Sequence, residues 1–197
     1  MTTELNLLKQ AVSLDLDKSN LPDPARIVAA LLKLEKNAKK KQTNLDYADL
    51  IGCWNLRFIT GTQKTRKRAG IVLGAGKYIP QFISIKITYE SDRQANNIGR
   101  VKNSVKLAPI ELSLTGPTKL LNNKSILAFD FTTIKIVAFG LELYDGYIRN
   151  GKARETNFYH QTIKEQAFFN YFYVDENTIA ARGKGGGLAL WGRDYKK

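Results

Sequence analysis

The chain is poor in the two residue types that build most covalent and metal-dependent sites. Its 197 residues include one cysteine, Cys53, and one histidine, His160. A single cysteine excludes an intramolecular disulfide, and a zinc site held by a protein draws on several cysteine and histidine ligands. We therefore expect neither a disulfide nor a metal site, and the sequence indicates no required cofactor.

Long apolar runs are also missing. No stretch reaches the roughly 18 apolar residues of a membrane-spanning helix. Segment 1–12 is polar and amphipathic and lacks the pattern of a signal or transit peptide. The length suits one domain with a real core, so we expect a single domain over 1–197. The expected location is the cytoplasm or the periphery of a membrane.

Positive charge is what the chain has in excess. It carries 31 lysines and arginines against 18 acidic residues, a formal net charge of +13. Such a charge attracts a polyanion, which can be nucleic acid, an anionic membrane surface or an acidic protein. It can equally serve only to keep the surface solvated. The densest cluster lies in a glycine-bounded loop and comprises Lys64, Arg66, Lys67 and Arg68.

The first 49 residues are predicted to be helical. Apolar residues recur at helical spacing over 4–16 and again from Ile27 to Ala38. Asp23 and Pro24 form a strong helix start, because the carboxylate can cap and proline suits the first helical position. These helices have one apolar side, so we expect them to lie against or cap the rest of the chain.

From Leu50 onward the pattern is that of strands. The stretch 50–60 places Trp54, Leu56, Phe58 and Thr60 at alternate positions after Gly52, and alternation continues from Ile79 to Tyr89. Short strands with regular turns predict an antiparallel barrel or sandwich over 50–197. The further predicted strands are 99–107, 110–114, 125–131, 133–139, 142–148, 153–162, 168–174, 178–182 and 188–191.

Catalytic arrangements find little support. The close acidic pairs, such as Asp175 and Glu176, sit at predicted turns or helix ends without an activating partner. Cys53, beside a tryptophan at a strand start, reads as core filler. The glycine runs at 74–76 and 183–187 lack the strand–loop–helix context of a phosphate-binding loop. We therefore predict that the protein is not an enzyme.

Nucleic-acid binding is also disfavoured. It would require cations interleaved with exposed aromatic residues on one strand face. Here the aromatic residues mostly share faces with isoleucine, leucine and valine, while the cations fall in loops and on opposite faces. The arrangement indicates an apolar interior and a basic exterior, as in a small barrel that holds an apolar ligand and rests on anionic headgroups.

Motifs at both ends resemble the plastid lipid-associated protein family, also called PAP/fibrillin. The family's Leu-x-Gly-x-Trp-x-Leu strand after two or three helices is matched by Leu50, Gly52, Trp54 and Leu56, with Phe58 in place of tyrosine. The family's terminal strand pair is matched by Tyr-Val-Asp-Glu-Asn at 173–177, Arg-Gly at 182–183 and an apolar tail at 188–191. Residues 178–181 and Arg57 depart from the family pattern.

The resemblance implies a lipocalin-like antiparallel barrel closed by helices. It implies non-enzymatic binding of an apolar small molecule, namely a lipid, carotenoid or quinone, at the thylakoid membrane or lipid globules. A role in photoprotection of these membranes follows, in a cyanobacterial-type member or a mature plastid chain. The alternative is a basic barrel with a filled interior that binds an acidic protein or nucleic acid through its surface.

Three groups of candidate residues follow. In lipocalin-like barrels a late arginine commonly covers the tryptophan of the Gly-x-Trp strand, so Gly52, Trp54, Arg182 and Gly183 are expected to close the barrel, with Arg193 as second candidate. The cations at 64–68 are assigned to an anionic membrane or partner. The expected pocket residues are Phe58, Ile83, Ile85, Phe129, Phe131, Phe139, Tyr144, Phe158 and Phe172; for each of them core packing is the competing interpretation.

Overall fold

The computed structural model describes residues 2–13, 20–41, 45–61, 76–92, 96–121 and 124–195. Its helices are α1 (Thr2–Val12), α2 (Pro24–Lys41), α3 (Tyr47–Leu50), α5 (Gly151–Asn157) and the 3₁₀ helix η2 (Phe158–His160). Its strands are β1 (Gly52–Thr60), β2 (Gly76–Tyr78), β3 (Ser84–Ser91), β4 (Ile98–Leu107), β5 (Ile110–Leu120), β6 (Ile126–Phe129), β7 (Thr133–Ala138), β8 (Leu141–Tyr147), β9 (Ala167–Val174), β10 (Thr178–Gly183) and β11 (Leu188–Arg193).

Eight of these strands close into an antiparallel barrel. They pair in the order β4-β3-β1-β11-β10-β9-β6-β5, and the pairing of β4 with β5 completes the circle. The prediction of a mainly β fold with N-terminal helices and a closed antiparallel barrel is therefore confirmed. Within the described ranges, no helix is long and apolar enough to cross a membrane.

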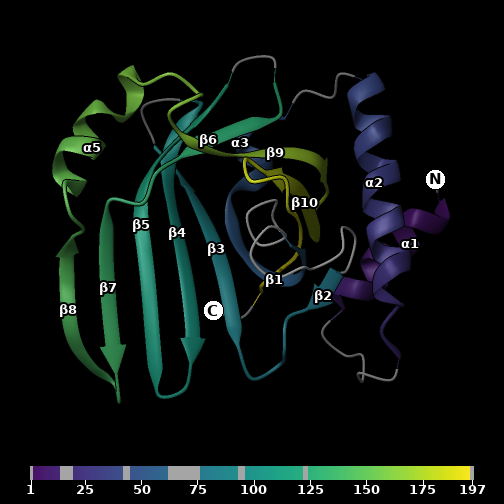
Figure 1. Ribbon diagram of the computed structural model, residues 1–197, viewed down its shortest axis with the longest axis horizontal. Coiled ribbons are helices and arrows are strands. Elements are labelled where there is room, and N and C mark those ends of the chain that lie inside the picture. Colours follow the sequence, from purple (N-terminus) through teal and green to yellow (C-terminus); the bar gives the residue numbers. More distant parts are fainter. Residues whose placement is uncertain are drawn as a thin grey trace.

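A sheet extension grows out of this barrel from β5. Residues 118–120 of β5 pair with β6 as part of the barrel wall. Residues 110–115 of β5 pair instead with β7, which in turn pairs with β8. Strands β3, β4, β5, β7 and β8 therefore form one curved sheet that projects beyond the barrel (Figure 1). We call the part of this sheet from β7 to β8, with the ends of β3, β4 and β5 beside it, the extension.

Helices α1 and α2 cover the outside of the barrel on the side away from the extension (Figure 1). The apolar stripe of α2 is buried as its spacing predicts, with Ile27 and Leu31 fully buried against Leu190 of β11. Asp23 caps the helix, because its Oδ1 accepts hydrogen bonds from the first backbone N–H groups of α2. The helices thus form a second hydrophobic layer outside the sheet.

An ion pair fixes α2 to the barrel. Glu35 is 5% exposed and accepts two hydrogen bonds from the Arg182 guanidinium, at 2.8 Å from Nε and 2.6 Å from Nη2. Arg182 Nη1 also donates to the Gly186 carbonyl at 2.5 Å. The bidentate geometry holds the pKa of the Glu35 carboxyl below its ordinary value, against the opposing effect of burial.

The predicted strand at 153–162 is wrong. Residues 151–157 form α5, and Phe158 begins the 3₁₀ turn η2. Side-chain contacts favour the helix here: Arg154 pairs with Asp130, and Glu155 Oε2 accepts a hydrogen bond from Thr132 at 2.8 Å. These partners lie on the link between β6 and β7, so tertiary contacts override the apparent alternation of the segment.

Candidate functional site

One end of the barrel is sealed. Trp54 is fully buried, and its indole Nε1 donates to the Leu50 carbonyl at 2.7 Å. The Arg193 guanidinium lies over the ring, 4.0 Å from its centroid, and its Nη1 donates to the Ile51 carbonyl at 3.0 Å. Gly52 makes this approach possible, because a Cβ there would stand 2.6 Å from Arg193 Nη1.

The interior above this seal is filled. Tyr89 and Tyr171 share a hydrogen bond of 2.6 Å between their hydroxyls, and Tyr47 bonds Thr118 at the same distance. Burial raises the pKa of Tyr47 to about 12 and that of Tyr89 well above its ordinary value, so both stay protonated. Phe129 stacks on Phe169, which closes the space between them. Among the described residues, the side chains of this half of the barrel thus pack and hydrogen-bond against one another.

The other end is open. A pocket of about 270 Å³ lies at this mouth. Its floor includes Trp191 and Phe169, whose rings meet edge to face at 5.4 Å. Among the residues that the structure describes, none of the side chains that line it is charged. The lining residues are Leu56, Ile59, Thr60, Ile85, Ile87, Asn103, Phe169, Gly183, Gly185, Gly187, Leu188, Ala189 and Trp191.

The mouth continues onto an apolar surface of the extension. Residues directly opposite in an antiparallel pair point to the same side of the sheet, so the register defines this surface. One row across β3, β4, β5, β7 and β8 consists of Ile85, Val105, Leu112, Ile136 and Tyr144. We call this side the apolar face; Asn103, Leu114, Ile134, Ala138 and Leu141 also belong to it.

The opposite side of the same sheet is polar and ion-paired. Lys135 Nζ lies 2.5 Å from Glu142 Oε2 and 3.6 Å from Asp145 Oδ2. Lys86 Nζ lies 2.5 Å from Asp194 Oδ2, and the hydrogen bond that it donates to this carboxylate raises the pKa of Lys86. The sheet is therefore amphipathic. Its apolar side lies half-buried to exposed from Ile85 outward to Tyr144.

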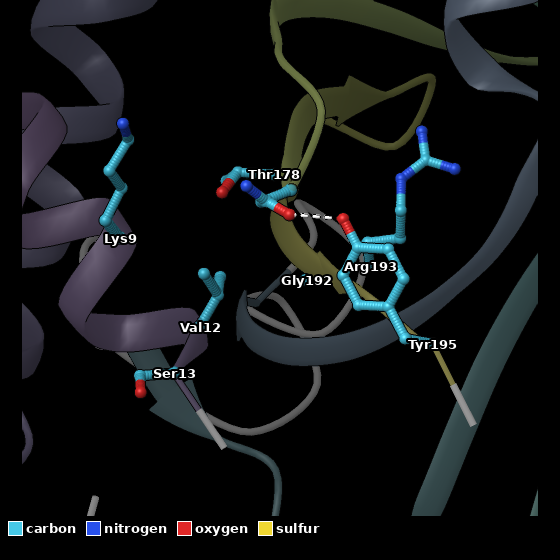
Figure 2. Close-up of a pocket in the computed structure, with 8 residues that line it drawn as sticks. Lys9, Val12, Ser13, Thr178, Gly192, Arg193 and Tyr195 are labelled. Carbon is cyan, nitrogen blue, oxygen red and sulfur yellow. Dashed lines mark hydrogen bonds between the residues drawn. The ribbon is translucent and has the colours of Figure 1, made fainter. Parts of the chain in front are cut away.

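Two other pockets are less suited to an apolar ligand. Figure 2 shows one of about 330 Å³ between α1 and β11, where Lys9 and Val12 face Thr178, Arg193 and Tyr195. Some of its polar groups are already engaged: Tyr195 bonds Asn177, and Arg193 covers Trp54, whereas the buried Thr178 hydroxyl has no partner among the described residues. The second, of about 390 Å³, lies along the loop 21–24 and segment 78–81. The mouth remains the strongest site because it is uncharged and continuous with the apolar face.

The structure scatters the predicted pocket residues. Ile85 lines the mouth. Phe129 and Phe131 belong to the filled part of the barrel, and Phe158 is buried in η2 outside the strands. Ile83 precedes β3 and is half-buried, while Phe139 and Tyr144 lie exposed on the extension. Sequence reasoning missed Leu56, Phe169 and Trp191, which line the mouth. Only Leu56 has a local signal, because it alternates with Trp54, which is expected at the barrel floor.

Phe58 is excluded from the interior by a bulge in β1. Leu56 pairs with Trp191, but after a register shift at Arg57 the next pair is Phe58 with Leu190. The extra residue moves Phe58 to the outer side, where it packs with α1 and α2. Phe172 also packs against this outer layer. The cause is different there: Phe169 and Tyr171 belong to the inner cluster, so plain alternation already turns Phe172 outward.

Arg182 is not the arginine that covers Trp54. Strand β10 runs from Thr178, beside the seal, to Gly183 at the mouth, so Arg182 lies at the opposite end and pairs with Glu35. Arg193, the second candidate, is in place. Gly183 lines the mouth instead of closing the floor. The cations Lys64, Arg66, Lys67 and Arg68 lie outside the described residues.

Among the residues that the structure describes, no cluster of three or more histidine, cysteine, aspartate or glutamate side chains could hold a metal ion. Cys53 is a free thiol and half-buried at the start of β1. The prediction that the chain is not an enzyme stays a prediction.

Comparison with known proteins adds no assignment. No family profile matches the chain, and no curated protein matches it significantly. A solved structure described as the NMR structure of the protein from Burkholderia xenovorans is similar over 76% of this chain and 87% of that one, with 12% identity and a TM-score of 0.36. A similarity this distant carries no argument, so the resemblance to PAP/fibrillin proteins stays a prediction.

Proposed function

We propose that the protein binds an apolar small molecule without catalysing a reaction, with one end of the ligand in the barrel mouth and the rest along the apolar face. The observation that carries this proposal is the continuity between an uncharged pocket and an exposed apolar sheet surface. Soluble domains rarely leave such a surface open without a binding role.

The size of the mouth favours a long ligand. Its volume of about 270 Å³ is just below the range of roughly 300–1,000 Å³ that is typical of small-molecule sites. A lipid, carotenoid or quinone of the class implied by the sequence resemblance exceeds it. The part that does not fit would lie along the row from Ile85 to Tyr144, which leads away from the mouth.

The polar groups at the mouth suit the end of such a molecule. Thr60 is engaged, because its Oγ1 accepts the Leu188 backbone N–H at 2.9 Å. Asn103 stands on the apolar face at the pocket wall and offers an amide to a carbonyl or hydroxyl. Apolar burial would supply most of the affinity, at about 25 cal/mol for each Å² removed from water.

The setting of this binding is part of the proposal. The sequence resemblance points to the thylakoid membrane or lipid globules and to a protective role there. The alternative, a basic adaptor for an acidic protein, is supported by the net charge of +13. The two candidate functions differ in whether they need the pocket at the mouth. An adaptor that binds its partner through its exterior does not require an open apolar pocket.

The test fills the pocket. Ala189 is half-buried and lines the mouth, so Ala189→Phe should occupy the space that a ligand needs. Binding of a prenylated quinone and of a carotenoid, measured by fluorescence quenching of Trp191, should weaken about tenfold or more. The matched control is Ala29→Phe on the exposed side of α2, which should bind as the parent does.

A second variant keeps the binding test usable if Ala189→Phe does not fold. Ile85→Gln places an amide at the half-buried mouth and should also weaken binding. Native mass spectrometry of the protein from a photosynthetic host should show a co-purified apolar molecule in the parent and in Ala29→Phe. The proposal would be refuted if the parent protein co-purified with no apolar molecule and if both mouth variants bound quinone and carotenoid as tightly as the parent does. That result would favour the adaptor.

A further inference from the structure

Three turns at one edge of the extension carry large exposed apolar side chains. Phe82, in the turn before β3, is 70% exposed; Phe139, in the turn between β7 and β8, and Leu141, which begins β8 directly after that turn, are 81% and 68% exposed. Leu107 and Ile110 flank the turn between β4 and β5 and are also exposed. We call these five residues the apolar edge. Figure 1 shows the three turns at the lower end of the sheet, away from α5.

The three turns lie side by side. Ser84 pairs with Lys106, which places the turn with Phe82 next to the turn that follows Leu107. The Phe139 backbone N–H donates to the Pro109 carbonyl at 3.0 Å, which joins the second turn to the third. The five side chains therefore form one row along the rim where the apolar face ends.

Phe139 occupies a conformation that its side chain disfavours. Its φ is 53°, and Gly140 follows with φ 78°. A two-residue hairpin turn with two positive φ values favours asparagine or aspartate before glycine, because a Cβ is strained there. The ring is 81% exposed, so packing within the chain does not repay this strain. A strained, exposed aromatic residue at a tip indicates a contact outside the chain.

The shape and charge of the edge fit a lipid bilayer better than a protein surface. The exposed side chains form a single narrow row along the rim, whereas a protein interface buries a broad patch with a central core. Lys106, with a side chain 64% exposed, stands beside Leu107 at the same rim, where its Nζ lies 3.9 Å from Glu111 Oε2 and leaves the local charge balanced. The net charge of +13 attracts the whole molecule to anionic headgroups.

We propose that the apolar edge inserts into the interfacial layer of an anionic bilayer and holds the protein there. Insertion of the rim would bring the apolar face to the membrane surface, so that a ligand could pass between the bilayer and the mouth without crossing water. This last step rests on the proposed ligand function, whereas the insertion itself stands on the edge alone. It requires apolar contact in addition to charge, which the experiment separates.

The test removes the tips. Sedimentation with vesicles of phosphatidylcholine and a minor fraction of phosphatidylglycerol should show binding that is weakened but not abolished at high salt. The triple variant Phe82→Ser, Phe139→Asn, Leu141→Ser should bind at least about thirtyfold more weakly, because it removes three inserted side chains. The matched control, Leu32→Ser with Tyr195→Ser, removes exposed apolar residues elsewhere and should bind normally.

Folding and ligand binding serve as separate readouts. Phe139→Asn alone should leave the melting temperature equal or higher, since asparagine suits the positive φ. Ala189→Phe should bind vesicles normally, so failure of the pocket and failure of the edge are distinguishable. Vesicle binding that ignores the triple variant, or that high salt abolishes, would overturn the proposal. So would a parent dimer that the triple variant splits while vesicle binding is unchanged, because the edge would then contact a second copy.

Discussion

The sealed end of the barrel and the extension use the same kind of strand in opposite ways. At the seal, Trp54 and Ile87 point inward from paired strands and are buried among side chains from the far wall. On the extension, Ile136 and Tyr144 occupy equivalent inward positions, yet Tyr144 is exposed. The strands differ little in local pattern. What differs is whether a second layer stands opposite.

This difference separates apolar side chains that the described barrel buries from those that it leaves exposed. Where the barrel closes on itself, apolar side chains satisfy one another and contribute stability. Where β5 leaves the circle to pair with β7, no other described strand stands opposite the apolar face, so the described residues do not bury it. Substitutions at the two places should therefore change different quantities: unfolding free energy at the seal, and binding on the extension.

The largest effect on stability is expected from Trp54→Ala. The substitution empties the fully buried seal and leaves the Arg193 guanidinium without its ring. We expect a loss of about 3–5 kcal/mol, which corresponds to a fall of about 10 °C in melting temperature for a chain of this length. Calorimetry or circular dichroism measures it. A melting temperature within experimental error of the parent would show that Trp54 does not close the barrel.

A smaller effect is expected from Glu35→Gln, which tests the attachment of α2. The variant weakens two charge-assisted hydrogen bonds and leaves Arg182 with the Gly186 carbonyl. We expect a loss of about 2 kcal/mol in denaturant unfolding at neutral pH. The control is Lys33→Gln, on the same helix as Glu35. It removes an exposed ion pair with Glu4 of α1 and should lower the free energy of unfolding much less.

The stability difference between the parent and Glu35→Gln should depend on pH in a definite direction. The hydrogen bonds from Arg182 lower the pKa of Glu35 in the folded state from its ordinary value of 4.5. A carboxyl with a lowered folded pKa stabilises the protein above its unfolded pKa, and this contribution is lost as pH falls through the folded value. The stability gap between the parent and Glu35→Gln should thus be full at neutral pH and shrink below about pH 4.5. A gap that widens on acidification would contradict the ion pair.

Much of the fold could be predicted because the barrel and helices obey simple periodicities. Ile27 and Leu31 recur at helical spacing and are buried together, and Ile85, Ile87 and Tyr89 alternate and share the inner side of β3. The start of α2 is equally local, since Asp23 and Pro24 define it alone. Features that depend on residues close together in the sequence could therefore be predicted from the residue pattern.

The candidate site depended on features without such a local signal. The bulge at Arg57 moves Phe58 outward, and nothing in the residues 50–60 marks it. The choice between Arg182 and Arg193 is set by the end of the barrel that each reaches, which only the register of β10 and β11 decides. The departure of β5 toward β7 is likewise a matter of strand pairing, so the open apolar face could not be read from alternation.

The smallest stability effect is expected from Ile136→Ala on the apolar face, compared with Ile87→Ala in the barrel. Ile87 is 4% exposed, and its truncation should cost about 3 kcal/mol by leaving a cavity. Ile136 occupies an equivalent inward position but is only half-buried, so the same truncation should cost about 1 kcal/mol or less, because water or neighbouring side chains fill the space. Chemical denaturation of both variants and the parent, free of lipid and ligand, measures the pair. Equal costs would mean that the apolar face is covered in the free protein, and the contrast between a self-satisfied barrel and an open extension would then fail.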